Sequence, residues 1–544
     1  MQKGVYTGLN CLNKLSFLCY LTLLIETVFM HYAKKLLLLF TLLLGIFFAS
    51  ESYKYLELRP QGPHQWRQTD CASFTLNYAK DDLPLLEPSI HKLFSDNGTT
   101  GKTAGEFPLL YYFVGQVWKV TGQNEPLYRI INLSIFCLGL LALFRAIYPF
   151  IRHRALAYLL AALPLSIPVI TYYAPNFLQN STALSMVFIA WSFVSAFIRN
   201  PKIGYALLAT LFFALGGLLK ITALISFLAL LGTLAIDLLW KFDSRVIFKT
   251  KKRAITILST SAAFVLGSSA LWYKMARDYC TEHGGWFTFN DLWPIWRSTP
   301  EYIKSTFDRI TDYWKFEFFT GAQYILLVLA IVFVLIKFKR LRFFEKGMIG
   351  FLVIGNLSYF LLWFNAAYDH DYYFINLYAL PVFLLFVLFK YTDLSRWLPK
   401  KASTPVLWVL TIVALGWSAS SASKSLHMRY NGWINGNGHN QFEDFFDITP
   451  YLRNELKIDR KVPVIVYPDP SYSISLYLAD QVGWPIRRSA NAAELWYSIN
   501  LHQPAYILVN DTTDFNRRNY AEDLPIERVG NHKSVDIYQI SREQ

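Results

Sequence analysis

Two acidic residues in the first long polar stretch of the chain have surroundings that suit acid–base chemistry. Asp70 ends the run His64-Gln-Trp-Arg-Gln-Thr-Asp70, and Glu106 stands two residues before Pro108. A carboxylate at a lipid–water boundary is partly desolvated, which raises its pKa and makes it a better base near neutral pH. Such a base takes the proton of an acceptor hydroxyl that lies within hydrogen-bond reach. The residues alone also allow a structural role, with Asp70 as the N-cap of an amphipathic helix and Glu106 as a solvated carboxylate before a second helix.

Lys220 and Arg67 are the candidates for holding an anionic group near these acids. Lys220 stands alone between two apolar runs, and Arg67 precedes Asp70 by one helical turn. A guanidinium fork suits phosphate oxygens, and fixed positive charge stabilises a phosphate leaving group. The alternative for Lys220 is a side chain that snorkels to the membrane interface.

A third motif, Asp-His370-Asp-Tyr-Tyr373, lies in a short connection between two later apolar runs. The flanking acids favour the protonated form of His370, which suits it to bind phosphate or acceptor. Tyr373 and His64 accompany these motifs as further substrate-binding candidates. The alternative is an acidic turn that caps the following helix. No spacing among these residues demands a metal, so we assign no metal site and no cofactor and leave a divalent ion open.

The composition places these motifs in a membrane protein. Of the 544 residues, 54% are hydrophobic and only 17% are charged, whereas soluble domains carry roughly 25% charged residues. The mean hydropathy is +0.27. The net charge of +14 does not indicate a nucleic-acid partner, because the basic residues form short clusters between apolar runs.

Eleven apolar runs have the length and composition of membrane spans, which predicts a polytopic α-helical protein with about eleven transmembrane helices. They are Leu36–Ser50, Leu127–Phe150, Ala155–Ala174, Thr182–Ile198, Ile203–Leu219, Ile221–Trp240, Ala254–Trp272, Tyr324–Ile336, Gly347–Ala367, Tyr373–Phe389 and Pro405–Ala419. Every second connection is rich in Lys and Arg, whereas the short connections on the other side, 175–181 and 367–372, have none and a third holds only Lys220. By the positive-inside rule, the basic connections are cytoplasmic.

The spans and their orientation divide the chain into three predicted regions. Residues 1–33 form an apolar extension of uncertain status, and residues 34–420 form the transmembrane domain with outer loops 51–125 and 273–322. Residues 421–544 form a small soluble α/β domain on the outer face, with strands at 462–467, 506–509 and 535–540 and a helix at 471–479. Since charged candidates gather in the outer loops rather than inside the spans, we expect chemistry at the outer membrane surface.

Together these motifs resemble the GT-C membrane glycosyltransferases. A long first outer loop with an acid and a helix, followed by Glu106-Phe-Pro-Leu and Tyr-Tyr, is most similar to the glycosyltransferase 39 group, which includes protein O-mannosyltransferases and lipid A aminoarabinose transferases. The run Trp66-Arg-Gln-Thr-Asp70 and the motif around His370 resemble bacterial members of this group. The familiar Asp-Glu pair is absent, because Cys71 follows Asp70.

The resemblance implies transfer of a sugar from a polyprenyl-phosphate donor to a lipid, glycan or protein acceptor on the periplasmic side of the bacterial inner membrane. Asp70 matches the position of the base and Glu106 that of a second acid, and the resemblance puts a basic residue near the donor phosphate at Lys220. Two other functions remain as alternatives: a lipid-linked glycan transporter or flippase, and a non-catalytic scaffold of envelope glycan assembly. A transporter would place polar groups inside its spans and repeat its halves, and neither feature is evident in the sequence.

Overall fold

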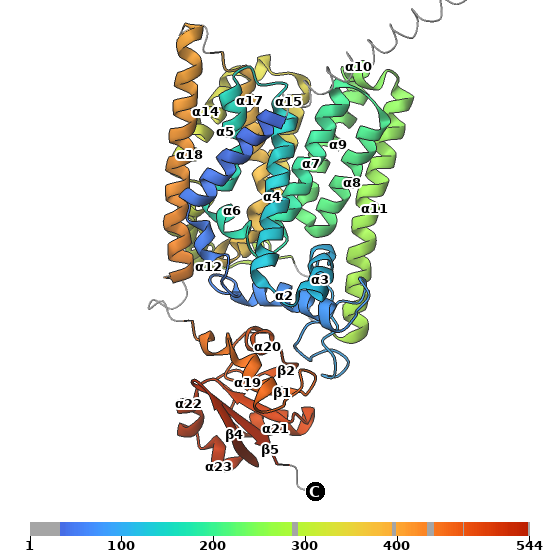
Figure 1. Ribbon diagram of the computed structural model, residues 1–544. Coiled ribbons are helices and arrows are strands. Elements are labelled where there is room, and N and C mark those ends of the chain that lie inside the picture. The colour runs from blue at the N-terminus through green and yellow to red at the C-terminus, as the bar shows by residue number, and fades with distance from the viewer. Residues whose placement is uncertain (1–32, 286–291, 394–398, 432–439, 472, 542–544) are drawn as a thin grey trace, which may run out of the picture.

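The computed structural model describes residues 33–285, 292–393, 399–431, 440–471 and 473–541, so nearly all of the predicted extension 1–33 lies outside the described residues. A bundle of long helices forms one part of the molecule, and a small sheet-containing unit lies beyond one end of it (Figure 1). Eight helices of the described part are long and apolar enough to cross a membrane, and two shorter apolar helices accompany them. The protein is thus a multi-pass membrane protein.

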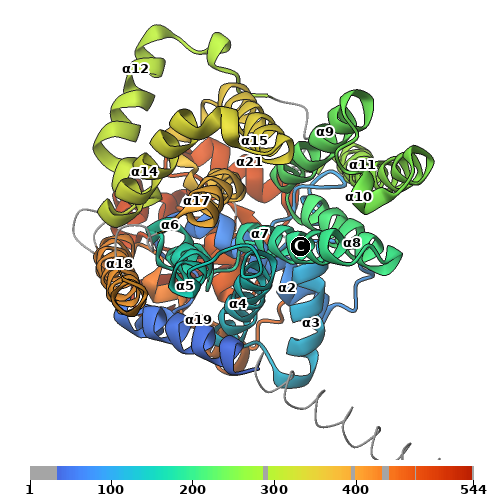
Figure 2. The same cartoon turned by 90° about the horizontal axis from the view of Figure 1, so that it is seen from above.

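Helices occupy all eleven predicted spans. They are the helix at 33–49, α4 (Glu125–Ile147), α5 (Arg154–Ala162) with α6 (Pro168–Tyr173), α7 (Asn180–Arg199), α8 (Ile203–Leu219), α9 (Leu224–Trp240), α11 (Lys251–His283), α14 (Gly321–Lys337), α15 (Phe343–Leu362), α17 (Ala379–Tyr391) and α18 (Lys400–Asn431). The longest two, α11 and α18, stand at opposite edges of the bundle (Figures 1 and 2). The third span is not one continuous helix as predicted, because Pro164 and Pro168 break it between α5 and α6.

The connections carry shorter elements. They are η1 (Ser52–Tyr55), α2 (Gln65–Lys80), α3 (Leu109–Thr121), η3 (Ile221–Ala223), α10 (Arg245–Phe248), α12 (Pro300–Arg309), α13 (Lys315–Phe318), α16 (Ala366–Asp369) and η7 (Asp371–Tyr378). In Figure 1, α2 lies across the end of the bundle that faces the C-terminal unit.

The C-terminal unit is a small α/β unit, as the sequence predicts, but its sheet has five strands where three were predicted. Its elements are α19 (Ile448–Asn454), β1 (Val464–Tyr467), α20 (Ile474–Ala479), β2 (Gly483–Pro485), α21 (Ala492–His502), β3 (Tyr506–Val509), α22 (Thr512–Arg517), α23 (Tyr520–Asp523), β4 (Ile526–His532) and β5 (Val535–Ile540). The strand order is β2-β1-β3-β5-β4, with β2, β1 and β3 parallel and β5 and β4 antiparallel. All of β1 is buried, which is typical of a strand covered on both faces.

The first outer loop extends this sheet. The backbone of Gly483 in β2 donates to the carbonyl of His91 at 3.1 Å and accepts from the amide of Leu93 at 2.9 Å. Because β2 is the edge strand, residues 91–93 cover an edge that would otherwise present unpaired backbone groups. The C-terminal unit is therefore joined to the loop that carries the candidate site.

Candidate active site

Asp70 lies in the second turn of α2 rather than at its start, so its predicted role as an N-cap is wrong. The predicted amphipathic character of this helix is also wrong, because α2 is buried along most of its length between α3 and the C-terminal unit. Gly115 of α3 permits the close approach of the two helices, since an added Cβ there would lie 2.8 Å from the Cβ of Tyr78. The polar face of α2 is thereby enclosed within the protein.

The Asp70 carboxylate has one hydrogen-bond donor from the C-terminal unit and one cation nearby. Ser473 Oγ, just before α20, donates to Asp70 Oδ1 at 2.6 Å, and Arg67 Nη1 lies 3.8 Å from Oδ2. Asp70 is only 3% exposed. Burial raises the pKa of Asp70 to about 6, although Arg67, Ser473 and Lys92 each act to lower it. Asp70 is therefore a carboxylate whose pKa is close to neutral pH, as a general base requires.

Glu106 bridges two cations instead of facing solvent, so the predicted solvated carboxylate is wrong. Its Oε2 accepts from Arg67 Nη2 at 2.5 Å, and its Oε1 accepts from Lys220 Nζ at 2.7 Å. The amide of Phe107 donates to the carbonyl of Leu218 at 3.1 Å, which fixes the Glu106 segment to the end of α8. Burial raises the pKa of Glu106, but Lys220 and Arg67 outweigh it and lower the pKa to about 2. Glu106 is thus ionised at neutral pH.

Lys220 occupies the break between α8 and η3 and points inward. It is 6% exposed, and its ammonium lies over the ring of Tyr373 at 4.6 Å from the centroid. The snorkelling interpretation is therefore wrong. A buried lysine held by a carboxylate and a tyrosine ring is a fixed positive charge, as binding of a phosphate requires.

The aromatic candidates continue this cluster. The ring of His370 stacks on Tyr373 at 5.3 Å between centroids and lies 5.4 Å from His64. His64 precedes α2 in a left-handed backbone conformation with φ of 57°, which is uncommon outside glycine. Its Nε2 lies 3.5 Å from Asp371 Oδ1. All seven residues predicted for the site thus belong to one chain of contacts: Asp70, Arg67, Glu106, Lys220, Tyr373, His370 and His64.

Three further residues of this region carry no signal in the sequence. Ser473 lies in the C-terminal unit, where nothing in its surroundings marks it. Lys92 belongs to the first outer loop, and burial lowers its pKa to about 8 while Asp70 and Asp469 raise it. Arg429 of α18 is fully buried, and its Nη2 contacts Asp371 Oδ2 at 2.8 Å. Because Asp371 contacts both Arg429 and His64, the buried arginine holds this side of the site in place.

Comparison with known proteins identifies the fold. No family model matches the chain, and no curated protein matches it in sequence. Among solved structures, ArnT from Cupriavidus metallidurans in the apo state is similar with a TM-score of 0.56 at 13% identity, and ArnT bound to undecaprenyl phosphate with 0.57 at 12%. Each match covers 92% of this chain and 97% of ArnT.

A third structure, the arabinofuranosyltransferase AftD from Mycobacteria, is similar with a TM-score of 0.51 at 13% identity, over 93% of this chain and 41% of AftD. At such low identity these likenesses concern the fold. They extend over the membrane helices and the C-terminal unit alike, in agreement with the resemblance found in the sequence. The chain has the GT-C membrane fold.

Proposed function

We propose that this protein is a membrane glycosyltransferase that moves a sugar from a polyprenyl-phosphate donor to a hydroxyl of an envelope acceptor on the periplasmic side. The observation that carries the proposal is a buried carboxylate with a pKa near 6 beside a pair of cations bridged by a second, ionised carboxylate. In support, ArnT shares the fold and has been solved with undecaprenyl phosphate bound.

The roles of the residues follow from their charges. Arg67, Lys220 and Glu106 together carry one net positive charge, which complements the single negative charge of a sugar phosphodiester. As the bond from the anomeric carbon to the phosphate oxygen breaks, the leaving phosphate gains a second negative charge. Cations fixed beforehand in a buried site stabilise that charge without reorganisation. Glu106 keeps the two cations in place, and His370, Tyr373 and His64 line the site beside them.

Asp70 serves as the base. The acceptor oxygen forms a bond to the anomeric carbon on the face opposite the phosphate, and its proton passes to the Asp70 carboxylate. The electron pair of the broken bond leaves with the polyprenyl phosphate, so the sugar is transferred with inversion. Ser473 now donates the hydrogen bond that an acceptor hydroxyl would donate in this step. We therefore infer that the acceptor takes the place of the Ser473 hydroxyl beside Asp70.

The experiment is a donor-consumption assay on purified protein in detergent, with radiolabelled polyprenyl-phosphate sugars and extracts of envelope acceptors. The proposal predicts release of polyprenyl phosphate by the wild type, and weaker donor binding by Lys220→Gln. The variant Lys274→Gln is the control, because Lys274 is a surface lysine of α11 that pairs with Asp278. Donor that binds but is never consumed, with any acceptor, would refute the transferase and favour transport or scaffolding.

A further inference from the structure

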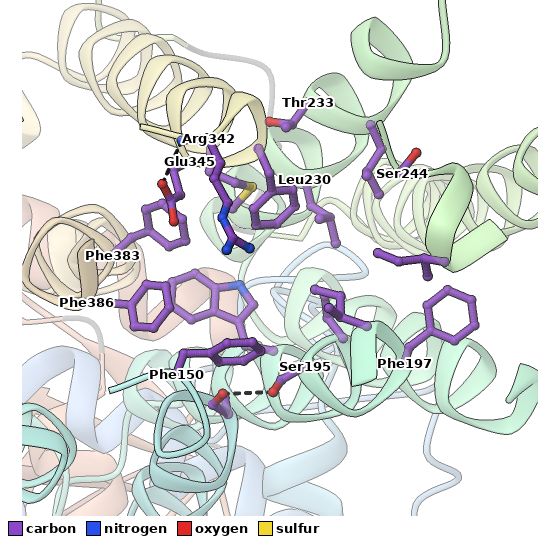
Figure 3. A pocket seen from close by; sticks show the side chains of 18 of the residues that line it. Phe150, Ser195, Phe197, Leu230, Thr233, Ser244, Arg342, Glu345, Phe383 and Phe386 are labelled. Carbon is purple, nitrogen blue, oxygen red and sulfur yellow. Dashed lines mark hydrogen bonds between the residues drawn. The ribbon is translucent and has the colours of Figure 1, made fainter. Parts of the chain in front are cut away.

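A cavity lies at the opposite end of the bundle from the candidate active site. Its volume is about 460 Å³, and it is lined by the ends of α4, α7, α9, α15 and α17 together with α10. Figure 3 shows aromatic and aliphatic side chains on most of its walls, among them Phe150, Phe383, Phe386 and Leu230. Such a volume falls within the range of roughly 300–1,000 Å³ seen for small-molecule sites. The walls suit a hydrocarbon chain.

One guanidinium points into this apolar space. Arg342, at the start of α15, is exposed and projects between the rings in Figure 3. Three acids line the cavity, and two of them, Glu345 and Asp237, already accept hydrogen bonds, Glu345 in part from the backbone amide of Arg342 at 3.0 Å. Glu345 pairs with Lys390 and accepts from the Tyr391 hydroxyl at 2.8 Å. Among the described residues, Arg342 forms no ion pair with that carboxylate.

The second lining acid is Asp237, whose two carboxylate oxygens accept from the backbone amides of Asp243 and Ser244 at 2.9 and 3.0 Å. Asp243 itself is exposed at the rim, in a connection that is strongly basic. That connection, 241–253, holds Lys241, Arg245, Lys249, Lys251, Lys252 and Arg253. Although Asp243 lines the cavity, the connection as a whole carries six cations against this one acid, and such a surplus of positive charge attracts anions to this end of the bundle.

We propose that this cavity binds a lipid phosphate, with the hydrocarbon chain among the aromatic rings and the phosphate on Arg342. An arginine in a pocket between transmembrane helices, beside a cluster of Lys and Arg, is an arrangement that suits an anionic headgroup at a membrane surface. The site lies roughly 20 Å from Lys220 along α9, at 1.5 Å per residue. It is separate from the candidate active site, and the proposal does not depend on the proposed reaction.

The test is native mass spectrometry of the full-length protein in detergent, titrated with phosphatidylglycerol and, separately, with phosphatidylcholine. We expect one retained phosphatidylglycerol and an affinity for it about tenfold lower in Arg342→Gln, because a charged hydrogen bond is lost. Arg342→Lys should lose less. The matched control is Arg340→Gln, which removes the same charge from an exposed residue outside the cavity. Val194→Trp fills the cavity and should abolish retention of phosphatidylglycerol. This variant tests the proposal independently if the arginine variants fold poorly.

Two further titrations identify the source of the lipid. If Lys220→Gln retains phosphatidylglycerol as well as the wild type does, the lipid binds away from the candidate active site. If polyprenyl phosphate is retained and Arg342→Gln weakens its retention, the site also binds the lipid carrier. If polyprenyl phosphate is not retained, the site binds phospholipids only. Equal retention of phosphatidylcholine and phosphatidylglycerol, or equal weakening by Arg340→Gln and Arg342→Gln, would overturn the proposal, because either result means only non-specific lipid around the bundle.

Discussion

At the scale of single residues, Asp70 and Glu106 belong to one chain of contacts, yet their environments move their pKa values in opposite directions. Asp70 is buried beside a neutral hydroxyl with its nearest cation 3.8 Å away, whereas Glu106 contacts two cations directly. Pairs of carboxylates whose environments separate their pKa values divide the roles of base and charged support between them. The proposed function therefore assigns proton transfer to Asp70 and not to Glu106.

This assignment fixes the pH dependence of the reaction. Because Asp70 acts as a base only when deprotonated, kcat/KM should fall about tenfold per pH unit below its pKa of about 6 and level off above it. Glu106 stays ionised throughout that range, since its pKa is about 2, and contributes no further step. A profile of kcat/KM from pH 4.5 to 8 measures this. A flat profile through pH 6 would exclude Asp70 as the base.

Ser473 offers a finer test at the same scale. Its hydroxyl donates to the ionised form of Asp70, so Ser473→Ala should raise the pKa of Asp70 by up to about one unit. The acid limb of the pH profile should shift upward by that amount while the rate at pH 8 is retained, because the acceptor supplies the missing donor. The matched control is Ser475→Ala, whose hydroxyl pairs with Asp469 instead. Complete loss of transfer at every pH would mean that Ser473 has a direct chemical role.

At the scale of elements, the site depends on a few breaks and close contacts. Lys220 points inward because the chain leaves α8 in an extended conformation there, and the Glu106 loop is bonded to the same end of α8. The sequence predicts Lys220 from its isolation and the spans from hydropathy and charge. It does not predict the burial of α2, because α2 is covered by α3 and by residues of the C-terminal unit about 400 positions later in the chain.

The bridge made by Glu106 should matter for stability as well as for binding. Glu106→Gln leaves Arg67 and Lys220 close together without their shared carboxylate, which should lower the free energy of unfolding by about 3–5 kcal/mol. Inorganic phosphate should raise the melting temperature of this variant more than that of the wild type, because it replaces the lost negative charge. Thermal unfolding in detergent measures both effects. Glu301→Gln, at an exposed acid of α12, serves as the control and should change little; equal melting temperatures for both variants would refute the role of the bridge.

At the scale of the whole molecule, the C-terminal unit is part of the site and not only attached to it. Its Ser473 contacts Asp70, its β2 is extended by the first outer loop, and Asp480 connects it to α2 and that loop. Asp480 accepts from Lys80 at 2.6 Å and lies 3.3 Å from His91 Nε2. The sequence predicts β1, β3 and β5 from their apolar runs, but it misses the short β2 and the polar edge strand β4. The docking of this unit has no sequence signal, because it rests on single polar residues far apart in the chain.

Removing the charge of Asp480 should weaken the contacts between the C-terminal unit and the first outer loop and so destabilise both. Asp480 is 2% exposed and has a left-handed backbone with φ of 47°, which asparagine tolerates. Asp480→Asn should therefore lower the free energy of unfolding by about 3 kcal/mol through lost charge pairing, without backbone strain. It should also speed proteolysis of the C-terminal unit. Asp523→Asn, an exposed acid in the same unit, is the control. Identical proteolysis of both variants would show that these contacts do not hold the unit in place.

The role of Asp70 as the base is tested most directly by single-turnover transfer with a radiolabelled polyprenyl-phosphate sugar, comparing the wild type with Asp70→Asn. Asparagine keeps the shape of the side chain and an oxygen that accepts from Ser473, but it cannot take up the proton. We expect Asp70→Asn to bind the donor as the wild type does and to lose transfer by at least about a thousandfold, because the general base and its charge are removed. Asp82→Asn, at an exposed acid just beyond α2, should keep full activity. Wild-type transfer by Asp70→Asn would contradict the assignment of Asp70 as the base.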